Sequence, residues 1–354
     1  MDLDNVSSMT KLDSQNMRGS ITELPLQIEQ IWQEVQEMTV DMKLFEDIDN
    51  IVFVAMGGSG LGAHIAQTIF GNALPCSYQV VNDYSLPQYV DEDTLVFLQS
   101  YSGNTEEVIN ALGQAIKKTK QVIVISAGGK LEELAKKHNL IHVKINPIHN
   151  PSNQPRMGIG YSVFSCLAML NKLNLIHVDS SEIRKIIDLL QLNNSVCGIE
   201  APLPSNPAKL FAEKIKGRMP ILVAGEFLVG TAHTICNQIN ENAKSMAIYY
   251  PLPEMNHHLL EALREPDEFS QRSLFVCFNS QLYSEKISAR LALTKESILG
   301  QGYIVEMIEP KGETKLQQTA HLLHFGAYAG YYLAMLYEID PSPIIQVESF
   351  KKKL

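Results

Sequence analysis

Short apolar runs alternate with helical stretches from residue 50 to residue 145. The runs are rich in β-branched residues, and the stretches between them, such as TEEVINALGQAIKKT, have helical spacing. Strands that are apolar on both faces and separated by helices indicate a parallel sheet covered on each side. The same order returns after the Pro-rich segment APLPSNP, in PILVAGE, AIYYP, SLFVCFN and YIVEMIEP. The sequence therefore predicts an α/β protein with two doubly wound, mainly parallel sheets flanked by helices.

Two copies of one domain fit the 354 residues, since a typical domain has roughly 150. The segment VAGEFLVGTAHT loosely repeats AMGGSGLGAHI, a strand that ends in a glycine turn. We expect an N-terminal extension and helix over residues 1–40, a first domain over 41–175, a linker region over 176–206 and a second domain over 207–354. The polar first 20 residues suggest a mobile or surface-draped extension.

Composition excludes several classes of protein. A formal net charge of −10 argues against general affinity for nucleic acid, which needs clustered Lys and Arg. The five cysteines are isolated from one another, which suggests neither a disulfide framework nor a zinc site. No apolar stretch approaches the roughly 18 to 20 residues that span a bilayer, and the start of the chain is polar and acidic. We expect a soluble, cytoplasmic protein.

The hexapeptide Ser100-Tyr-Ser-Gly-Asn-Thr105 joins the apolar run TLVFLQ to the helical stretch EEVINALGQAIKK. A helix N-terminus presents unpaired N–H groups and a partial positive charge, and the hydroxyls of Ser100, Ser102 and Thr105 add short neutral donors. This combination predicts a phosphate site. The alternative is that these side chains only cap the helix. The second half of the chain lacks such a hexapeptide, so we expect one phosphate site per chain.

A glycine turn, Gly57-Gly58-Ser59-Gly60, follows the run IVFVAM and opens another helix. Glycines there let the backbone turn tightly and approach a ligand closely. The stretch also fits G-x-G-x-x-A, and Asp83 lies 25 residues beyond Gly58, as in a dinucleotide site. Two adjacent turns, one of glycines and one of hydroxyls, suit a compact phosphorylated ligand better.

The pairing of MGGSG with SYSGNTEE resembles the sugar isomerase (SIS) domain, a doubly wound α/β module that binds phosphosugars. A narrower resemblance, to the bifunctional phosphoglucose/phosphomannose isomerases, lies in PRMG (155–158), NENAK (240–244), MNHH (255–258) and the C-terminal DPSPIIQVESFKKKL. It implies reversible conversion of glucose 6-phosphate and mannose 6-phosphate to fructose 6-phosphate through a cis-enediolate, without metal or organic cofactor. The phosphate would be held by Ser59, Ser100, Ser102 and Thr105, with the backbone of Gly57 and Gly58 beside it.

Such an isomerase needs a base, groups that open the sugar ring, and a positive charge beside the enediolate. The resemblance makes Glu241 the base that carries the proton between C1 and C2. A carboxylate of ordinary pKa is a poor base at neutral pH unless desolvation raises its pKa, so we expect a largely buried side chain. The alternative is a helix-surface glutamate paired with Lys244.

The other roles also follow from the resemblance. His257 would open the ring, and in this family the histidine is thought to reach the site of the other subunit, which implies a homodimer. The family's motif usually continues with Asn, where this chain has His258. Arg156 would stabilise negative charge on the enediolate. Lys351 would assist ring opening, although the following lysines Lys352 and Lys353 leave the register open, and a solvated basic tail is the alternative.

Rival interpretations stay open. One is a regulatory SIS protein that senses a phosphosugar without converting it, another is a nicotinamide-dependent oxidoreductase built on the glycine turn, and a third is a different SIS-family isomerase. His321 and His324 are three apart and could hold a metal, but a packed helix explains them better without a nearby carboxylate. The preference between the two C2 epimers is not encoded in any motif.

Overall fold

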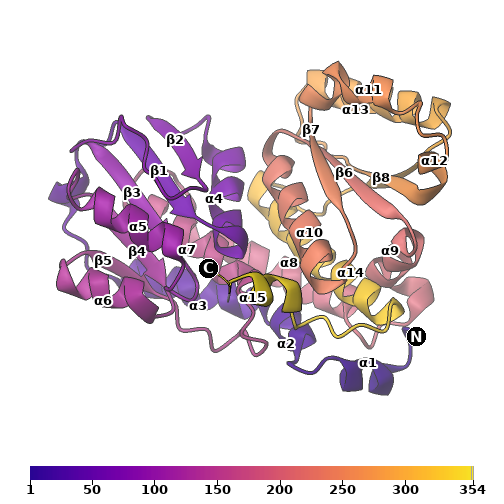
Figure 1. Ribbon diagram of the computed structural model, residues 1–354, viewed down its shortest axis with the longest axis horizontal. Helices are drawn as coiled ribbons and strands as arrows, with labels where there is room; N and C mark the ends of the chain where they lie inside the picture. Colours follow the sequence, from indigo (N-terminus) through magenta and orange to yellow (C-terminus); the bar gives the residue numbers. More distant parts are fainter. Residues whose placement is uncertain (352, 354) are drawn as a thin grey trace. The chain divides into compact units, whose positions relative to one another are not determined.

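The structure is a computed structural model that describes residues 1–351 and 353, so Lys352 and Leu354 lie outside the described residues. The chain forms two compact units. The first unit comprises residues 23–187, and the second comprises residues 1–22 together with 188–354. Figure 1 shows a twisted sheet with flanking helices in each unit. Among the described residues, none of the helices combines the length and apolar character that a membrane crossing needs.

The first unit is built on a five-stranded parallel sheet with the order β2-β1-β3-β4-β5. The strands are β1 (Asn50–Ala55), β2 (Ser77–Val81), β3 (Thr94–Gln99), β4 (Val122–Ser126) and β5 (Ile141–Lys144). Its helical segments are α3 (Leu24–Glu37), η1 (Met42–Phe45), α4 (Gly57–Phe70), α5 (Glu106–Ala115), α6 (Gly129–Lys137), η2 (Pro155–Met157) and α7 (Ile159–Lys172). The helix α8 (Ser180–Cys197) begins in this unit and ends in the second.

Both faces of this sheet are apolar, as the sequence predicts. Val52 and Leu98 belong to a core on the face that α5 and α6 cover. Side chains alternate between faces along a strand, so Phe53 and Phe97 point to the opposite side, where their rings stack 5.1 Å apart. All six residues of β3 are buried. A strand of this kind has to be central in a sheet with helices on both sides.

The second unit repeats the topology with four parallel strands in the order β7-β6-β8-β9. They are β6 (Met219–Gly225), β7 (Ile248–Leu252), β8 (Ser273–Phe278) and β9 (Ile304–Ile308). Its helical segments are α1 (Val6–Leu12), α2 (Met17–Thr22), η3 (Leu203–Ser205), α9 (Pro207–Ile215), η4 (Glu226–Leu228), α10 (Val229–Asn242), η5 (Glu254–His257), α11 (Leu259–Ala262), α12 (Phe269–Arg272), α13 (Glu285–Gly300), α14 (Lys315–Leu336) and α15 (Ile345–Lys351). The predicted fold, two doubly wound α/β domains, is confirmed.

Helix α14 is the centre of the second unit, and its residues from Leu316 to Leu336 are buried. A helix buried on all sides needs close neighbours, and a side chain added at Gly326 would lie 2.5 Å from Ile235 of α10. Glycine at this position therefore lets α14 and α10 pack closely. His324 is part of the same packing, because its Nε2 donates to the Ile21 carbonyl at 3.0 Å while its Nδ1 accepts from Asn193.

The first 20 residues lie against the rest of the second unit and bury only a few of their side chains. Met9 of α1 and Met17 of α2 are fully buried in the second unit. Asp13 accepts hydrogen bonds from the backbone N–H groups of Met17 (2.7 Å) and Arg18 (2.9 Å), which fixes the start of α2. Asp4 accepts from the buried ammonium of Lys209 at 2.9 Å. The few apolar residues of this polar segment are the ones that point inward.

Candidate active site

The glycine turn and the hydroxyl turn lie side by side in the first unit. Strands β1 and β3 are neighbours with Ala55 opposite Gln99, so the turns that follow them emerge at the same edge of the sheet. The backbone N–H of Tyr101 donates to Ser59 Oγ at 2.9 Å. Ser59 itself is buried. A hydrogen bond between the two turns therefore fixes their relative position.

Three hydroxyls converge within the Ser100–Thr105 turn. Ser100 Oγ lies 2.7 Å from Thr105 Oγ1 and 3.5 Å from Ser102 Oγ. It also accepts from the backbone N–H of Gly103 at 3.1 Å, and Gly103 has a φ of +70°, which favours glycine. Ser100 is buried and Ser102 is exposed, so the cluster leads from the interior to the surface.

Thr105 is the N-cap residue of α5, yet its side chain makes no capping hydrogen bond. Its hydroxyl is bonded to Ser100 instead. The helix therefore begins without a side-chain cap, which leaves its positive end to another acceptor. This arrangement favours the anion-binding interpretation over simple capping.

The corresponding turns of the second unit are closed by their own side chains. Ser284, the N-cap residue of α13, accepts from the N–H of Ile287 with its side chain. The backbone N–H of Ser284 donates to both carboxylate oxygens of Glu226, at 3.2 and 3.3 Å. Glu226 stands directly after β6, where the first unit has its glycine turn after β1. A carboxylate of the chain thus occupies the position that corresponds to the predicted anion site.

Arg156 lies against the glycine turn. A side chain added at Gly58 would be 3.2 Å from both the N and the Cα atom of Arg156, and Gly57 has a φ of +50°. The Arg156 side chain is only 1% exposed, and its Nη1 donates to Gln154 Oε1 at 2.8 Å. A buried guanidinium beside the glycine turn adds positive charge at this edge of the first sheet.

The loop that carries Arg156 is held to the hydroxyl turn by Asn150. Its Nδ2 donates to the hydroxyl of Tyr101 at 2.8 Å and to the carbonyl of Gln154 at 3.0 Å. Sequence reasoning missed this positioning residue. The available signal was the Asn- and Pro-rich loop itself, since buried asparagines commonly bond to nearby backbone. A hollow of about 270 Å³ between Ser102 and Pro155 opens beside these contacts.

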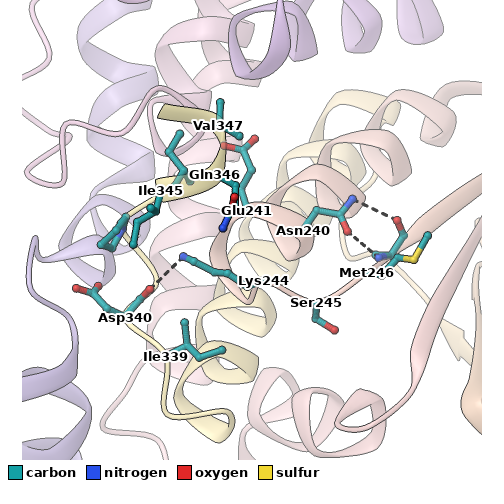
Figure 2. A pocket seen from close by; sticks show the side chains of 13 residues that line it. Asn240, Glu241, Lys244, Ser245, Met246, Ile339, Asp340, Ile345, Gln346 and Val347 are labelled. Atoms are coloured by element: carbon teal, nitrogen blue, oxygen red, sulfur yellow. Dashed lines mark hydrogen bonds between the residues drawn. The ribbon is translucent and has the colours of Figure 1, made fainter. Parts of the chain in front are cut away.

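Glu241 lines a cavity of about 850 Å³ in the second unit. It comes from the last turn of α10, and Figure 2 shows it beside Gln346 and Val347 of α15. The remaining lining residues are mostly apolar: Met246, Ala247, Ile339, Pro343, Ile344 and Ile345. Glu241 is half-buried, which is less burial than the sequence led us to expect.

Lys244 follows α10 on the same side of this cavity. Its Nζ donates to the carbonyl oxygens of Asn242 (3.2 Å), Asp340 (3.0 Å) and Pro341 (2.9 Å). These bonds tie the end of α10 to the segment after α14. Lys244 therefore bonds to the backbone of two separate chain segments.

The remaining candidates lie on the surface of the second unit. His257 ends η5 and is exposed, as is His258. Lys351 ends α15 and is exposed, and Lys353 is exposed beyond it, whereas Lys352 lies outside the described residues. The structure thus groups Ser59, the Ser100–Thr105 hydroxyls and Arg156 in the first unit. It groups Glu241 with the C-terminal segment in the second.

Two parallel sheets of matching strand order, one of them carrying a hydroxyl turn beside a glycine turn, define a protein with two sugar isomerase (SIS) domains. Residues 44–170 match the SIS domain, and residues 204–354 match the bacterial phospho-glucose isomerase C-terminal SIS domain. A bifunctional phosphoglucose/phosphomannose isomerase of Caldicellulosiruptor bescii is 32% identical over 96% of this chain and 98% of its own. The one of Aquifex aeolicus is 31% identical over 86% of this chain and 90% of its own.

The chain therefore belongs to the family of bifunctional phosphoglucose/phosphomannose isomerases, which confirms the resemblance seen in its motifs. Among solved structures, a hypothetical protein from Thermus thermophilus has a similar fold. The TM-score is 0.75 with 14% identity, over 98% of this chain and 93% of the other. At that identity the likeness shows the fold alone.

Proposed function

We propose that this protein is an isomerase that interconverts glucose 6-phosphate, and mannose 6-phosphate, with fructose 6-phosphate through a cis-enediolate. The observation that carries the proposal is the cluster of Ser100, Ser102 and Thr105 hydroxyls, with buried Arg156 against the adjoining glycine turn, in a member of this family. An α5 start without a side-chain cap supports a bound dianion there. Ser59 holds the two turns together, and the backbone of Gly57 and Gly58 allows the ligand to approach.

In this proposal, Glu241 moves the proton between C1 and C2 of the open-chain sugar. The apolar lining of its cavity supports that role, since desolvation favours the protonated form of a carboxyl and makes its anion a stronger base. Arg156 stabilises the negative charge that develops on the enediolate oxygens. Proton transfer between positioned side chains is the whole of the proposed route, so it uses neither a metal nor an organic cofactor.

We further propose that the protein is a homodimer, located in the cytoplasm, and that His257 opens the sugar ring in the site of the partner subunit. The exposure of His257 supports an exchange of this kind, because an exposed side chain is available to a second subunit. Lys351 is the proposed second ring-opening group.

The test is Glu241→Gln. Turnover in a coupled assay with glucose 6-phosphate and with mannose 6-phosphate should fall by roughly 10²- to 10⁴-fold, the usual contribution of a general base. Binding of glucitol 6-phosphate, which cannot isomerise, should stay nearly unchanged in calorimetry. Glu213→Gln, at an exposed position of α9, is the matched control and should behave like the wild type. Equal turnover in Glu241→Gln and the control would overturn the assignment of the base.

The same measurements separate the rivals. A wild-type protein that binds glucitol 6-phosphate but turns over neither sugar phosphate would be a sensor. A change in nicotinamide absorbance that depends on added NAD and on a sugar phosphate would indicate an oxidoreductase. Asp83, the acidic residue that a dinucleotide site would use, is exposed and accepts the backbone N–H of Tyr84 at 2.6 Å.

A further inference from the structure

The segment after α14 covers the cavity that contains Glu241, although it lies about a hundred positions further along the chain. Ile339 to Val347 supply most of the cavity wall on that side. Figure 2 shows residues of this segment, from Ile339 and Asp340 to Val347, around the end of α10. The segment leads into α15, whose last residue is Lys351. Its position therefore decides both the surroundings of Glu241 and where α15 begins.

The described side chains of α15 contribute little burial to the attachment of this segment. Ile345 is 69% exposed, and Val347 and Phe350 are also exposed. Burial of apolar surface is the usual source of packing energy for a short helix, and α15 has only seven residues. The firm part of the segment is its beginning, where Pro341 and Ser342 are buried.

Lys244 binds that beginning. Its ammonium donates to the carbonyl oxygens of Asp340 and Pro341, and to that of Asn242 in the last turn of α10. Hydrogen bonds from a charged donor are among the stronger ones, and a cation at the end of a helix also suits the helix dipole. The backbone of Lys244 has a φ of +50°, an uncommon conformation for a residue with a side chain. The turn thus places one long donor where two chain segments meet.

We propose that Lys244 is a positioning residue for the isomerase reaction, holding the C-terminal segment over Glu241. The inference rests on the proposed function for its catalytic consequence. Lys244 bonds to backbone carbonyls of the segment. It therefore fixes where α15 starts, whichever side chains that helix carries. Two of the three bonds, those to Asp340 and Pro341, connect the motif NENAK to the C-terminal segment.

The experiment compares Lys244→Met, which keeps the length of the side chain but removes its donors, with Lys244→Arg, which keeps charge and donors. In the coupled assay, kcat of Lys244→Met should fall roughly 10- to 100-fold, because small displacements near a reacting centre have effects of that size. KM should stay within a few-fold, since the proposed phosphate-binding hydroxyls belong to the first unit. Lys244→Arg should recover most of kcat. Lys286→Met, at an exposed position of α13, is the matched control.

Hydrogen–deuterium exchange of peptides covering residues 339–351 supplies a readout that does not depend on activity. Exchange there should accelerate in Lys244→Met and return toward the wild-type rate in Lys244→Arg. A fall in kcat with unchanged exchange would mean that Lys244 acts on the substrate directly. Unchanged kcat together with unchanged exchange would mean that Lys244 neither positions the segment nor affects the reaction. Either result overturns the inference. A wild-type protein without isomerase activity would instead overturn the proposed function, while the exchange data would still test the anchoring.

Discussion

Replacing Ser100 with alanine removes the central hydroxyl of the Ser100–Thr105 turn. In the folded protein this hydroxyl contacts Thr105 Oγ1 at 2.7 Å and accepts from the N–H of Gly103 at 3.1 Å. The N–H of Gly103 also bonds to the carbonyl oxygen of Ser100, at 3.0 Å, so the substitution does not leave this donor unsatisfied. The loss of folding stability should therefore stay near 1 kcal/mol, a typical net value for one hydrogen bond. For a cooperative unit the size of the first one, residues 23–187, that corresponds to a decrease in Tm of about 2–4 °C.

The effect on substrate binding should be larger. A hydrogen bond to a charged acceptor contributes about 1.5–3 kcal/mol, and each 1.4 kcal/mol is a factor of ten in affinity, so KM should rise by roughly 10- to 100-fold. The phosphate does not take part in the proton transfer, and its contacts are the same before and during the reaction. Loss of such uniform binding raises KM and leaves kcat nearly unchanged.

The assay is the coupled measurement of fructose 6-phosphate formation, with KM and kcat determined separately and Tm measured alongside. Ser165→Ala is the matched control, because Ser165 on α7 is equally buried and its hydroxyl donates to the Ser162 carbonyl at 3.4 Å, not to a residue of the turn. It should lower Tm to a similar extent without raising KM. If Ser100→Ala raises KM no more than Ser165→Ala does, the hydroxyl turn does not bind the phosphate.

Two further predictions concern stability. Gly103→Ala should destabilise the protein by more than about 2 kcal/mol in urea unfolding, because the residue has a φ of +70° and a side chain there would meet the Gly128 carbonyl. Gly113→Ala, in α5 with open space around it, is the control and should stabilise the protein by about 0.5–1 kcal/mol. Equal effects of the two substitutions would contradict the argument from backbone conformation. Burial lowers the pKa of His321 to about 4 and that of His324 to about 3. Below pH ~6.5 the unfolded chain therefore binds more protons than the folded protein. The free energy of unfolding should decrease as the pH is lowered, by about 1.4 kcal/mol per pH unit for each histidine. His321→Gln should reduce this slope between pH 4 and 6 by about 1.4 kcal/mol per pH unit, the contribution of one histidine. An unchanged slope would contradict the lowered pKa of His321.

The hydroxyl turn was predictable from the sequence because its geometry follows from local rules. Apolar runs identify β1 and β3, and neighbouring parallel strands present the turns that follow them at one edge of the sheet. Ser59 and Ser100 therefore come together in any sheet with this strand order. The hydrogen bond between Ser59 and the Tyr101 backbone is a consequence of that order.

The surroundings of Glu241 were not predictable in the same way. Its cavity walls come from residues 339–347, and no periodic pattern near residue 241 indicates which distant segment will cover it. The packing of the N-terminal residues was not predictable for a related reason. Met9 and Met17 are isolated apolar residues in a polar segment, and their burial depends on the surface that the rest of the second unit presents to them. Long-range packing of this kind overrides local composition.

The two units show how a repeated fold can carry one anion site instead of two. In both units a helix begins after the third strand in sequence order, and its free N–H groups need acceptors. In the second unit the chain supplies these acceptors itself, through the Ser284 hydroxyl and the carboxylate of Glu226. In the first unit the corresponding residue, Thr105, turns its hydroxyl to Ser100 and leaves the helix start without a side-chain cap. An external dianion could compete with Glu226 only by displacing a tethered carboxylate, which is always present at high local concentration. At the start of α5, a dianion would meet no such competing side chain from Thr105. The difference in capping between the two helices, rather than any difference in topology, therefore favours a single phosphate site per chain.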